Sequence, residues 1–533
     1  MSNELIKALQ NPTLYDHPTE GFKVLETHIS WVILTGPFAY KIKKPVNFGF
    51  LDFSSLEKRK HFCEQELHLN RRLAPSLYLD VVTISGSVTH PALDTKTGSD
   101  ENPHIFEYAL KMTQFPQKGI LSTLQEKQVL TSKHINELST ILASFHQRVE
   151  IAPINSTYGM PGSVLAPIEE NFKQIQSRLK TLNLECTDTL HSLKEWALSS
   201  FQQLRPIIEA RKTQGFIREC HGDLHLGNIT LFNDALVIFD CIEFNPSLRW
   251  VDVISDLAFL IMDLEKRGQN AYANQLCNAY MELTGDYEGI ALLKFYKSYR
   301  AMVRAKVAVL SIKEEKDTTE AKRSLMKEYQ QYINLADKYE AIPNRYILLM
   351  HGYSGSGKSV VSNTLVEELG AIRIRSDVER KRLYSYMASD RTDSPLNGGI
   401  YTEEATQKTY DRIVKLASTL LEGGLPIIVD ATHLKKWQRN LLLQEAESHA
   451  VPLLIISCCA ADEVLKERIE KRSNEKLDAS EAGIKTLKNQ KQTAEALSNS
   501  ELSYTLHVHT DQEGHLTKLI KEVKHHFRPE LIL

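Results

Sequence analysis

The chain has 533 residues, more than one hydrophobic core accommodates, so we expect two or three domains. A formal net charge of −3 excludes a general attraction to nucleic acids or anionic membranes, although a local basic groove stays open as an alternative. The seven scattered cysteines form no CxxC pair, and no apolar run is long enough to span a bilayer. Because the N-terminus also has no signal-peptide pattern, these features predict a cytoplasmic protein.

The first part of the chain combines strand-like and helix-like patterns. The runs ISWVILT (29–35) and AYKIK (39–43) predict two strands that a Gly-Pro turn joins. A charged helical stretch follows at residues 56–73. Between about residues 121 and 336 the pattern is mostly helical, with a strand–loop–strand element near 216–243. The apolar face of the first helical stretch is predicted to consist of Phe62, Leu67, Leu69 and Leu73.

Beyond a boundary near Pro343, apolar strands alternate with helical stretches. This alternation is typical of a parallel, doubly wound sheet. The predicted strands are YILLM (346–350), IRIR (372–375), LPIIVD (425–430), PLLIISC (452–458) and YTLHVHT (504–510). The predicted fold class is therefore an α+β module followed by an α/β module. The predicted parts are an N-terminal lobe at 1–110, a helical lobe at 111–340 and a parallel-sheet domain at 345–533.

The stretch HGYSGSGKS (351–359) lies between a predicted strand and a predicted helix. In this context glycines let backbone N–H groups point inward at a phosphate, and the helix N-terminus adds positive potential. We expect Lys358 to reach the β- and γ-phosphates of a nucleotide and Ser359 to hold Mg²⁺. The other predicted phosphate-binding residues are Gly352, Ser354, Gly355, Ser356 and Gly357.

Further along the chain, Asp377 follows a strand at the position where a carboxylate would meet an acceptor hydroxyl group. Arg380, one helical turn later, would hold an acceptor phosphate. A second interpretation stays open, because Ser376 and Glu379 have the spacing of a capping box. Asp377 would then only favour the start of the helix.

Asp430 ends a buried strand and is a candidate for the Mg²⁺ shell. Arg468 and Arg472 precede the polar stretch 473–482 and are candidates for a mobile lid that neutralises charge on a transferred phosphoryl group. A helix surface covered with solvated charges is the alternative for each arginine.

The segments GYSGSGKS, SDVERKRL, IIVDATHLKKWQRN and RIEKR resemble the P-loop kinases that include polynucleotide 5′-hydroxyl kinases and zeta-toxin-like sugar-nucleotide kinases. The resemblance covers about residues 345–500. It implies that Asp377 is the general base, that Arg380, Asp430 and Arg439 lie at the acceptor, and that Arg472 lies on the lid. The basic residues are not accompanied by a series of aromatic side chains, which speaks against a nucleic-acid acceptor.

The octet HGDLHLGN (221–228) has a metal-site and a kinase interpretation. A transition-metal site would need His221, Asp223 and His225 to converge, but the glycines indicate a loop and no further ligand follows at a familiar spacing. A kinase would use Asp223 to orient the acceptor hydroxyl group and Asn228, five residues later, to bind Mg²⁺.

The residues around this octet favour the kinase interpretation. ITLFNDALVIFDCIEF (229–244) predicts strand, turn and strand, with Asp240 near its end as a further metal ligand.

A kinase also needs a lysine that holds ATP. Lys41, in AYKIKK, is the first candidate, and Lys43 lies on the same strand face as the runner-up. The predicted partner of this lysine is Glu66, with Glu64 second. The segment 107–116 is the predicted hinge that would meet adenine.

Together, AYKIKK, HFCEQELHLN, HGDLHLGN and VIFDCIEF resemble the aminoglycoside-phosphotransferase-like kinases, whose fold is protein-kinase-like and bilobal, over roughly residues 25–310. The resemblance implies that Asp223 is the catalytic base, that Asn228 and Asp240 bind Mg²⁺, that Lys41 holds ATP, and that Asp256 is a structural carboxylate. The glycine-rich phosphate cover is reduced to TGPFA, and no acidic aminoglycoside pocket is evident. The order of the two modules also resembles a family of bacterial proteins of similar length.

These patterns predict two ATP- and Mg²⁺-dependent phosphotransferase modules that act on hydroxyl groups of small molecules or nucleotides. Two alternatives stay open: a nucleic-acid 5′-hydroxyl kinase that uses the P-loop part, and a regulatory protein in which one module binds nucleotide without catalysis. One further basic face, formed by Lys297, Arg300 and Arg304, is interpreted as solvated or paired with acids in preference to an anion site.

Overall fold

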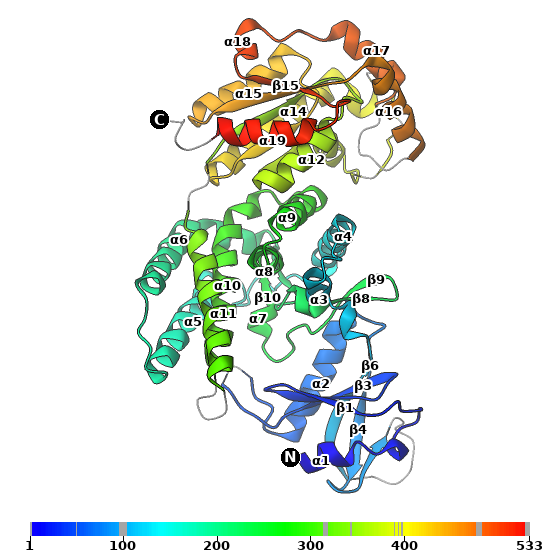
Figure 1. The fold of residues 1–533 in the computed structure, drawn as a ribbon, viewed down its shortest axis with the longest axis vertical. Coiled ribbons are helices and arrows are strands. Elements are labelled where there is room, and N and C mark those ends of the chain that lie inside the picture. The colour runs from blue at the N-terminus through cyan, green and yellow to red at the C-terminus, as the bar shows by residue number, and fades with distance from the viewer. Residues whose placement is uncertain are drawn as a thin grey trace. The chain divides into compact units, whose positions relative to one another are not determined.

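The computed structural model describes most of the chain in two compact units (Figure 1). The first unit comprises residues 1–134, 145–165 and 207–260, and the second comprises 135–144, 166–206 and 261–533. The predicted boundary at Pro343 and most of the predicted lid stretch 473–482 lie outside the described residues, and the three predicted parts stay a prediction. The described residues are 3–49, 51–94, 104–312, 318–341, 344–388, 390–392, 394–395, 398–475 and 482–527.

The first unit contains a six-stranded antiparallel sheet in the order β1-β2-β3-β6-β4-β5. Alternate residues of β3 point to opposite faces, as strand geometry requires. Tyr40 and Ile42 join the buried apolar cluster that includes residues of α1 (Asn3–Ala8), whereas Lys41 and Lys43 contact Glu66 of α2 (Leu56–Asn70). The strands are β1 (Lys23–Glu26), β2 (Ser30–Leu34), β3 (Phe38–Lys43), β4 (Tyr78–Gly86), β5 (Pro91–Asp94) and β6 (Ile105–Thr113).

Helix α2 begins after Ser55, whose hydroxyl group accepts a hydrogen bond from the Lys58 N–H group. Its buried face differs from the predicted one, because Phe62 and Leu67 are only partly buried. The buried face consists of Arg59, Cys63, Glu66, Leu69 and Asn70. Polar partners on the sheet, not apolar spacing, therefore decide which side of this helix is covered.

The segment that carries the octet belongs to the first unit. A short turn of helix, η3 (Leu226–Asn228), leads into the hairpin of β8 (Ile229–Phe232) and β9 (Ala235–Ile238). Asn233 and Asp234 both have positive φ values, 51° and 60°, as a two-residue hairpin turn requires. This confirms the predicted strand–turn–strand element. The neighbouring elements are β7 (Ile217–Glu219), α7 (Pro246–Arg249), β10 (Trp250–Asp252) and α8 (Val253–Lys266).

The rest of this region is helical, as predicted. Its helices are α3 (Leu121–Glu126), α4 (Ser132–Arg148), α5 (Pro161–Thr181), α6 (Asp188–Thr213), α9 (Asn270–Thr284), α10 (Leu293–Leu310) and α11 (Thr319–Lys338). Among the described residues, no helix is both long enough and apolar enough to cross a membrane.

The second unit contains a five-stranded parallel sheet in the order β12-β13-β11-β14-β15. Its strands agree with the five predicted ones to within two residues at either end. Three of the five are short runs of mainly apolar residues that are buried along almost their whole length. The five strands are β11 (Ile347–His351), β12 (Ile372–Arg375), β13 (Ile427–Asp430), β14 (Leu453–Cys459) and β15 (Thr505–His509).

Helices follow these strands. They are α12 (Lys358–Leu369), α13 (Ser376–Leu383), α14 (Glu403–Glu422), α15 (Lys436–Ser448), α16 (Asp462–Glu475), α17 (Ile484–Thr493), α18 (Asn499–Leu502) and α19 (His515–His526). The predicted fold class is confirmed: an antiparallel sheet with a helical part precedes a parallel sheet whose strands alternate with helices.

Candidate active sites

The first candidate site is built around Lys41 on β3. Its ammonium group donates to Glu66 Oε1 at 2.7 Å and to Asp240 Oδ1 at 2.8 Å. Burial raises the pKa of the Glu66 carboxyl group, but the charges of Lys41 and Lys43 outweigh burial and hold it below its usual range. The Asp240 side chain is 45% exposed, so this ion-pair chain ends at a carboxylate that a ligand can reach.

Lys43, the runner-up, lies deeper. It is 1% exposed, donates to Glu66 Oε2 at 2.6 Å and forms a short ion pair with Glu243. Glu64, the second candidate partner, has a 54% exposed side chain and pairs with Lys60 at 3.8 Å. The geometry thus separates Lys41, at the edge of the site, from Lys43, which is enclosed beneath it.

Asp240 has an uncommon backbone conformation. Its φ is 63°, in the left-handed region that an aspartate tolerates better than most residues. Its N–H group donates to the Tyr78 hydroxyl group at 3.1 Å, while Lys41 holds its carboxylate. A strained backbone conformation of this kind persists only when surrounding contacts hold the residue in place. It is common at functional positions.

The octet places Asp223 and Asn228 in contact. The Asn228 amide nitrogen donates to the Asp223 carbonyl oxygen at 2.9 Å and to its Oδ2 at 3.1 Å. The Asp223 side chain is 35% exposed, so one side of the carboxylate faces outward. Asn228 Oδ1 and the Asp240 carboxylate supply hard oxygen donors, the type that Mg²⁺ prefers. This donor set fits the predicted metal, although the assignment stays a prediction.

The two histidines of the octet serve the loop itself. His221 Nε2 lies 2.9 Å from the Phe239 carbonyl oxygen, and its Nδ1 accepts from the Asp223 N–H group at 3.3 Å. Burial lowers the pKa of His221, which favours this neutral form. His225 Nδ1 accepts from the Gly227 N–H group at 3.0 Å. His225 Nε2 lies 3.5 Å from Asp223 Oδ2, so all four ring nitrogens have partners in the loop or next to it.

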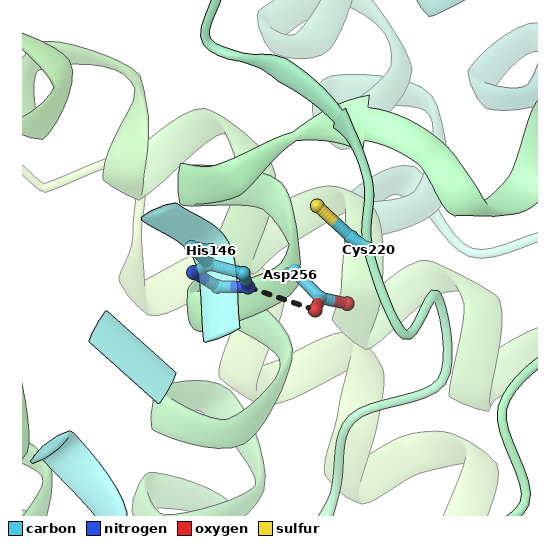
Figure 2. Close-up of side chains that lie close together, drawn as sticks. All are labelled: His146, Cys220 and Asp256. Carbon is cyan, nitrogen blue, oxygen red and sulfur yellow. Dashed lines mark hydrogen bonds and ion pairs between the residues drawn. The ribbon is translucent and has the colours of Figure 1, made fainter. Parts of the chain in front are cut away.

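Asp256, near the start of α8, supports this loop by accepting hydrogen bonds from its backbone. Its Oδ2 accepts from the His221 N–H group at 3.1 Å and its Oδ1 from the Gly222 N–H group at 2.8 Å. Figure 2 shows the ring of His146 pointing at the same carboxylate, with Nε2 at 3.1 Å from Oδ2. These contacts are those of the structural carboxylate that was predicted.

The close-up in Figure 2 also includes Cys220, whose Sγ lies with donor atoms of His146 and Asp256 inside a 4.8 Å cluster. The three side chains are buried, and both oxygens of Asp256 already accept backbone hydrogen bonds. These hydrogen bonds tie the Asp256 carboxylate to the backbone of the loop.

The second candidate site is the loop between β11 and α12. Gly352, Gly355 and Gly357 have φ values of 134°, 82° and 84°, which side chains other than glycine rarely adopt. A Cβ atom at Gly355 would also lie 2.7 Å from the Leu465 carbonyl oxygen. Ser356 has a buried hydroxyl group for which the described residues offer no hydrogen-bond partner. This cradle fits the predicted phosphate group.

Lys358 is folded back onto the loop. Its ammonium group donates to the carbonyl oxygens of Gly352 at 2.9 Å and Tyr353 at 2.8 Å. Burial lowers the pKa of Lys358, and the nearby carboxylates of Asp430 and Asp377 oppose this shift. The lysine and the two predicted acidic residues therefore belong to one electrostatic cluster.

Asp377 lies in the first turn of α13, directly beyond the end of β12. The alternative capping box does not form, because the N-cap residue of this helix is Arg375, which makes no side-chain capping hydrogen bond, and Ser376 is already the first helical residue. The Glu379 carboxylate instead pairs with Arg382 at 3.1 Å and with Arg412 at 2.6 Å. Asp430, at the end of β13, accepts a hydrogen bond from the Ser362 hydroxyl group at 2.9 Å.

Two predicted acceptor residues have other roles in this structure. Arg439 is 2% exposed, pairs with Glu501 at 2.5 Å and donates to the His433 carbonyl oxygen. Arg380 is 7% exposed and donates to the Ile400 carbonyl oxygen at 2.9 Å. Both guanidinium groups hold protein segments together, and their predicted contact with an acceptor stays a prediction.

The predicted lid arginines are placed differently from each other. Arg468 donates to Thr510 Oγ1 at 2.9 Å and is fixed beside the phosphate loop. Arg472 donates to the Ala482 carbonyl oxygen at 2.8 Å, and its charge contributes to lowering the pKa of Lys358. Arg472 thus lies within electrostatic reach of the loop.

A protein-family comparison matches the part of the chain that contains the parallel sheet. Residues 347–497 match the AAA domain family. Over 461 residues the chain is 28% identical to uncharacterised proteins of Mycobacterium tuberculosis and Mycobacterium bovis, covering 86% of this chain and 87% of each relative.

Solved structures are similar to parts of the chain. Spectinomycin phosphotransferase in complex with ADP is 14% identical, covers 64% of this chain and 98% of its own, and has a TM-score of 0.36. A gluconokinase of Sinorhizobium meliloti is 20% identical, covers 35% of this chain and 99% of its own, and has a TM-score of 0.24.

Two polar residues near the glycine-rich loop were not predicted from the sequence. Ser362 contacts Asp430 as described above, and Gln490 on α17 accepts from the Ser354 N–H group at 2.9 Å and donates to its hydroxyl group at 3.1 Å. Ser362 is three residues from the motif's Ser359, a spacing that indicates a shared helix face. Nothing in the sequence indicates that Gln490 folds onto a loop 136 residues away.

The basic face on α10 is internal. Lys297 pairs with Glu265 at 2.8 Å, Arg300 is 3% exposed, and Arg304 lies over the Tyr332 ring at 6.0 Å. The expectation of pairing is confirmed for Lys297.

The predicted hinge segment, 107–116, is mostly a strand. Residues 107–113 lie inside β6, and only the last residues of the segment leave the sheet.

Proposed function

We propose that the chain is an ATP-dependent kinase with two nucleotide sites, each of which transfers a γ-phosphate to the hydroxyl group of a small molecule or nucleotide in the cytoplasm. The observation that carries the proposal is the pair of unrelated constellations, Lys41–Glu66–Asp240 in the first unit and the Lys358 loop with Asp377 and Asp430 in the second. Each constellation combines one lysine with carboxylates that interact electrostatically with its ammonium group.

At the first site, Lys41 would hold nucleotide phosphates, and Asn228 with Asp240 would hold Mg²⁺. Asp223, which Asn228 holds by two hydrogen bonds, would orient the acceptor hydroxyl group for in-line attack. Bound Mg²⁺ would supply screening of the phosphate charge.

At the second site, the loop from Gly352 to Ser359 would surround the phosphates, with Lys358 redirected from its backbone contacts. Asp430 would hold Mg²⁺ together with Ser359, and Asp377 would align the second acceptor. Arg472 would add positive charge where the phosphoryl group is transferred.

The experiment that tests the proposal incubates the full-length protein with γ-labelled ATP, Mg²⁺ and panels of sugars, amino alcohols, nucleosides and 5′-hydroxyl oligonucleotides. Labelled product from either small-molecule panel supports the proposal. Product from the oligonucleotides alone would point to a nucleic-acid kinase, and no product with any acceptor, despite nucleotide binding, would favour a nucleotide-dependent switch.

Within this assay, Asp377→Asn should lower transfer at the AAA domain by about 10²–10⁴-fold, because the neutral amide cannot accept the hydroxyl proton. Binding of ATP at this site should persist. The matched control is Asp411→Asn, an exposed aspartate on α14, which should leave transfer unchanged. Full transfer by Asp377→Asn would remove Asp377 from the proposed reaction.

A further inference from the structure

The parallel sheet of the second unit has β12 as one of its two edge strands, the first in the strand order. An edge strand presents unpaired backbone groups that need partners. Helix α9, which lies alongside α12 in the same unit, supplies them (Figure 1). The Asn278 side-chain amide donates to the Ala371 carbonyl oxygen at 3.1 Å and accepts from the Arg373 N–H group at 2.7 Å. One side chain of α9 therefore occupies the place of a neighbouring strand.

The same helix holds the side chain of Arg373. Glu282 Oε1 accepts from Arg373 Nε at 2.9 Å and from its Nη2 at 2.5 Å. Arg375, two residues along the strand, lies 3.6 Å from the other oxygen of Glu282. Arg373 is 8% exposed, and a buried guanidinium group of this kind keeps its place only when its charge is compensated.

From Arg373 the contacts continue to the predicted metal shell. Arg373 Nη1 donates to the Ser362 hydroxyl oxygen at 3.1 Å, and that hydroxyl group donates to Asp430 Oδ2 at 2.9 Å. Ser362 is completely buried and Asp430 is 7% exposed. Glu282, Arg373, Ser362 and Asp430 thus form one line of hydrogen bonds from α9 to the end of β13.

We infer that Glu282 is a positioning residue of the P-loop site, which acts through Arg373 and Ser362 to set the orientation and charge environment of Asp430. The inference rests on the proposed function of this site. The Ser362 hydroxyl group lies 2.9 Å from Asp430 Oδ2 and 3.2 Å from the Ser359 carbonyl oxygen, and the shorter contact orients the carboxylate while Glu282 neutralises Arg373. Without that neutralisation, the positive charge of Arg373, one hydroxyl group away from Asp430, competes with Mg²⁺ for the carboxylate.

The test measures binding of a fluorescent ATP analogue to the full-length protein at increasing Mg²⁺ concentrations. Only the part of the signal that disappears in Lys358→Ala is assigned to the P-loop site, and the Mg²⁺ concentration at half of this signal is compared between variants. Glu282→Gln keeps the size and an acceptor oxygen but removes the charge. It should raise the half-saturating Mg²⁺ concentration about 10-fold, the usual effect of losing a partner that supports a metal ligand. In a Ser362→Ala background, Glu282→Gln should have no further effect.

The matched control is Asn274→Ala. Asn274 lies on the same helix and donates to the Glu367 carbonyl oxygen at 3.0 Å, outside the line to Asp430. This variant should leave the Mg²⁺ requirement within twofold of the wild-type value, although it loosens the contact between α9 and α12. If Glu282→Gln does not fold, Ser362→Ala alone should still raise the Mg²⁺ requirement.

An unchanged Mg²⁺ requirement in folded Glu282→Gln or in Ser362→Ala would overturn the inference and leave the proposed function intact. A wild-type protein without any Lys358-dependent signal would instead overturn the proposed function, and the inference with it.

Discussion

Replacing Asp223 with asparagine should lower phosphotransfer at the first site by about 10²–10⁴-fold, the range that a positioned general base contributes. The carboxylate lies beside Asn228 and is one-third exposed, so the substitution removes a charge and a proton acceptor without opening a cavity. ATP binding should survive, because Lys41 and Glu66 are untouched. The measurement is the initial rate of product formation together with the dissociation constant of ATP.

The control for this prediction is Asp234→Asn in the exposed turn of the same hairpin. Asparagine tolerates the left-handed backbone of that position, so the rate should not change. Phosphotransfer at the wild-type rate by Asp223→Asn would show that another group orients the acceptor.

The second large effect concerns stability. Lys43→Met should lower the free energy of unfolding of the first unit by about 3–5 kcal/mol, the cost of leaving buried charges without their partner. Without Lys43, the Glu66 and Glu243 carboxylates remain enclosed together, and burial already raises the pKa of Glu243. Hydrogen exchange of the β3 and α2 amides measures the stability of this unit alone. A single unfolding curve of a two-unit chain does not separate the stabilities of the two units.

Two further variants give this prediction its controls. Lys60→Met removes an exposed pair with Glu64 and should change stability by less than about 1 kcal/mol. The double variant Lys43→Met with Glu243→Met should recover part of the loss, because it removes the unpaired carboxylate as well. A Lys43→Met protein whose β3 amides exchange at the wild-type rate would contradict the assignment of Lys43 as a structural cation.

Much of the fold was predictable because its signals are local. The apolar runs of the parallel sheet, the Asn-Asp turn before Asp240 and the glycine-rich loop before Lys358 each depend on a few neighbouring residues. The pairing of Lys41 with Glu66 was also predictable, because strand alternation limited the choice to two lysines on one face.

The failures concern polar side chains whose partners are distant in sequence. Arg439 looked available for an acceptor, yet its partner Glu501 lies 62 residues away. The buried face of α2 is polar because Glu66 and Arg59 meet charged groups of the sheet, which apolar periodicity does not detect. The link from α9 to β12 joins residues about 90 positions apart, and only the folded chain reveals it.

The central claim is that one polypeptide binds two nucleotides on unrelated scaffolds. Equilibrium titration of the full-length protein with a non-hydrolysable ATP analogue and Mg²⁺ tests it most directly. The account predicts two bound analogues per chain and one after Lys358→Ala. A single bound analogue per chain, unaffected by replacement of Lys358, would contradict it.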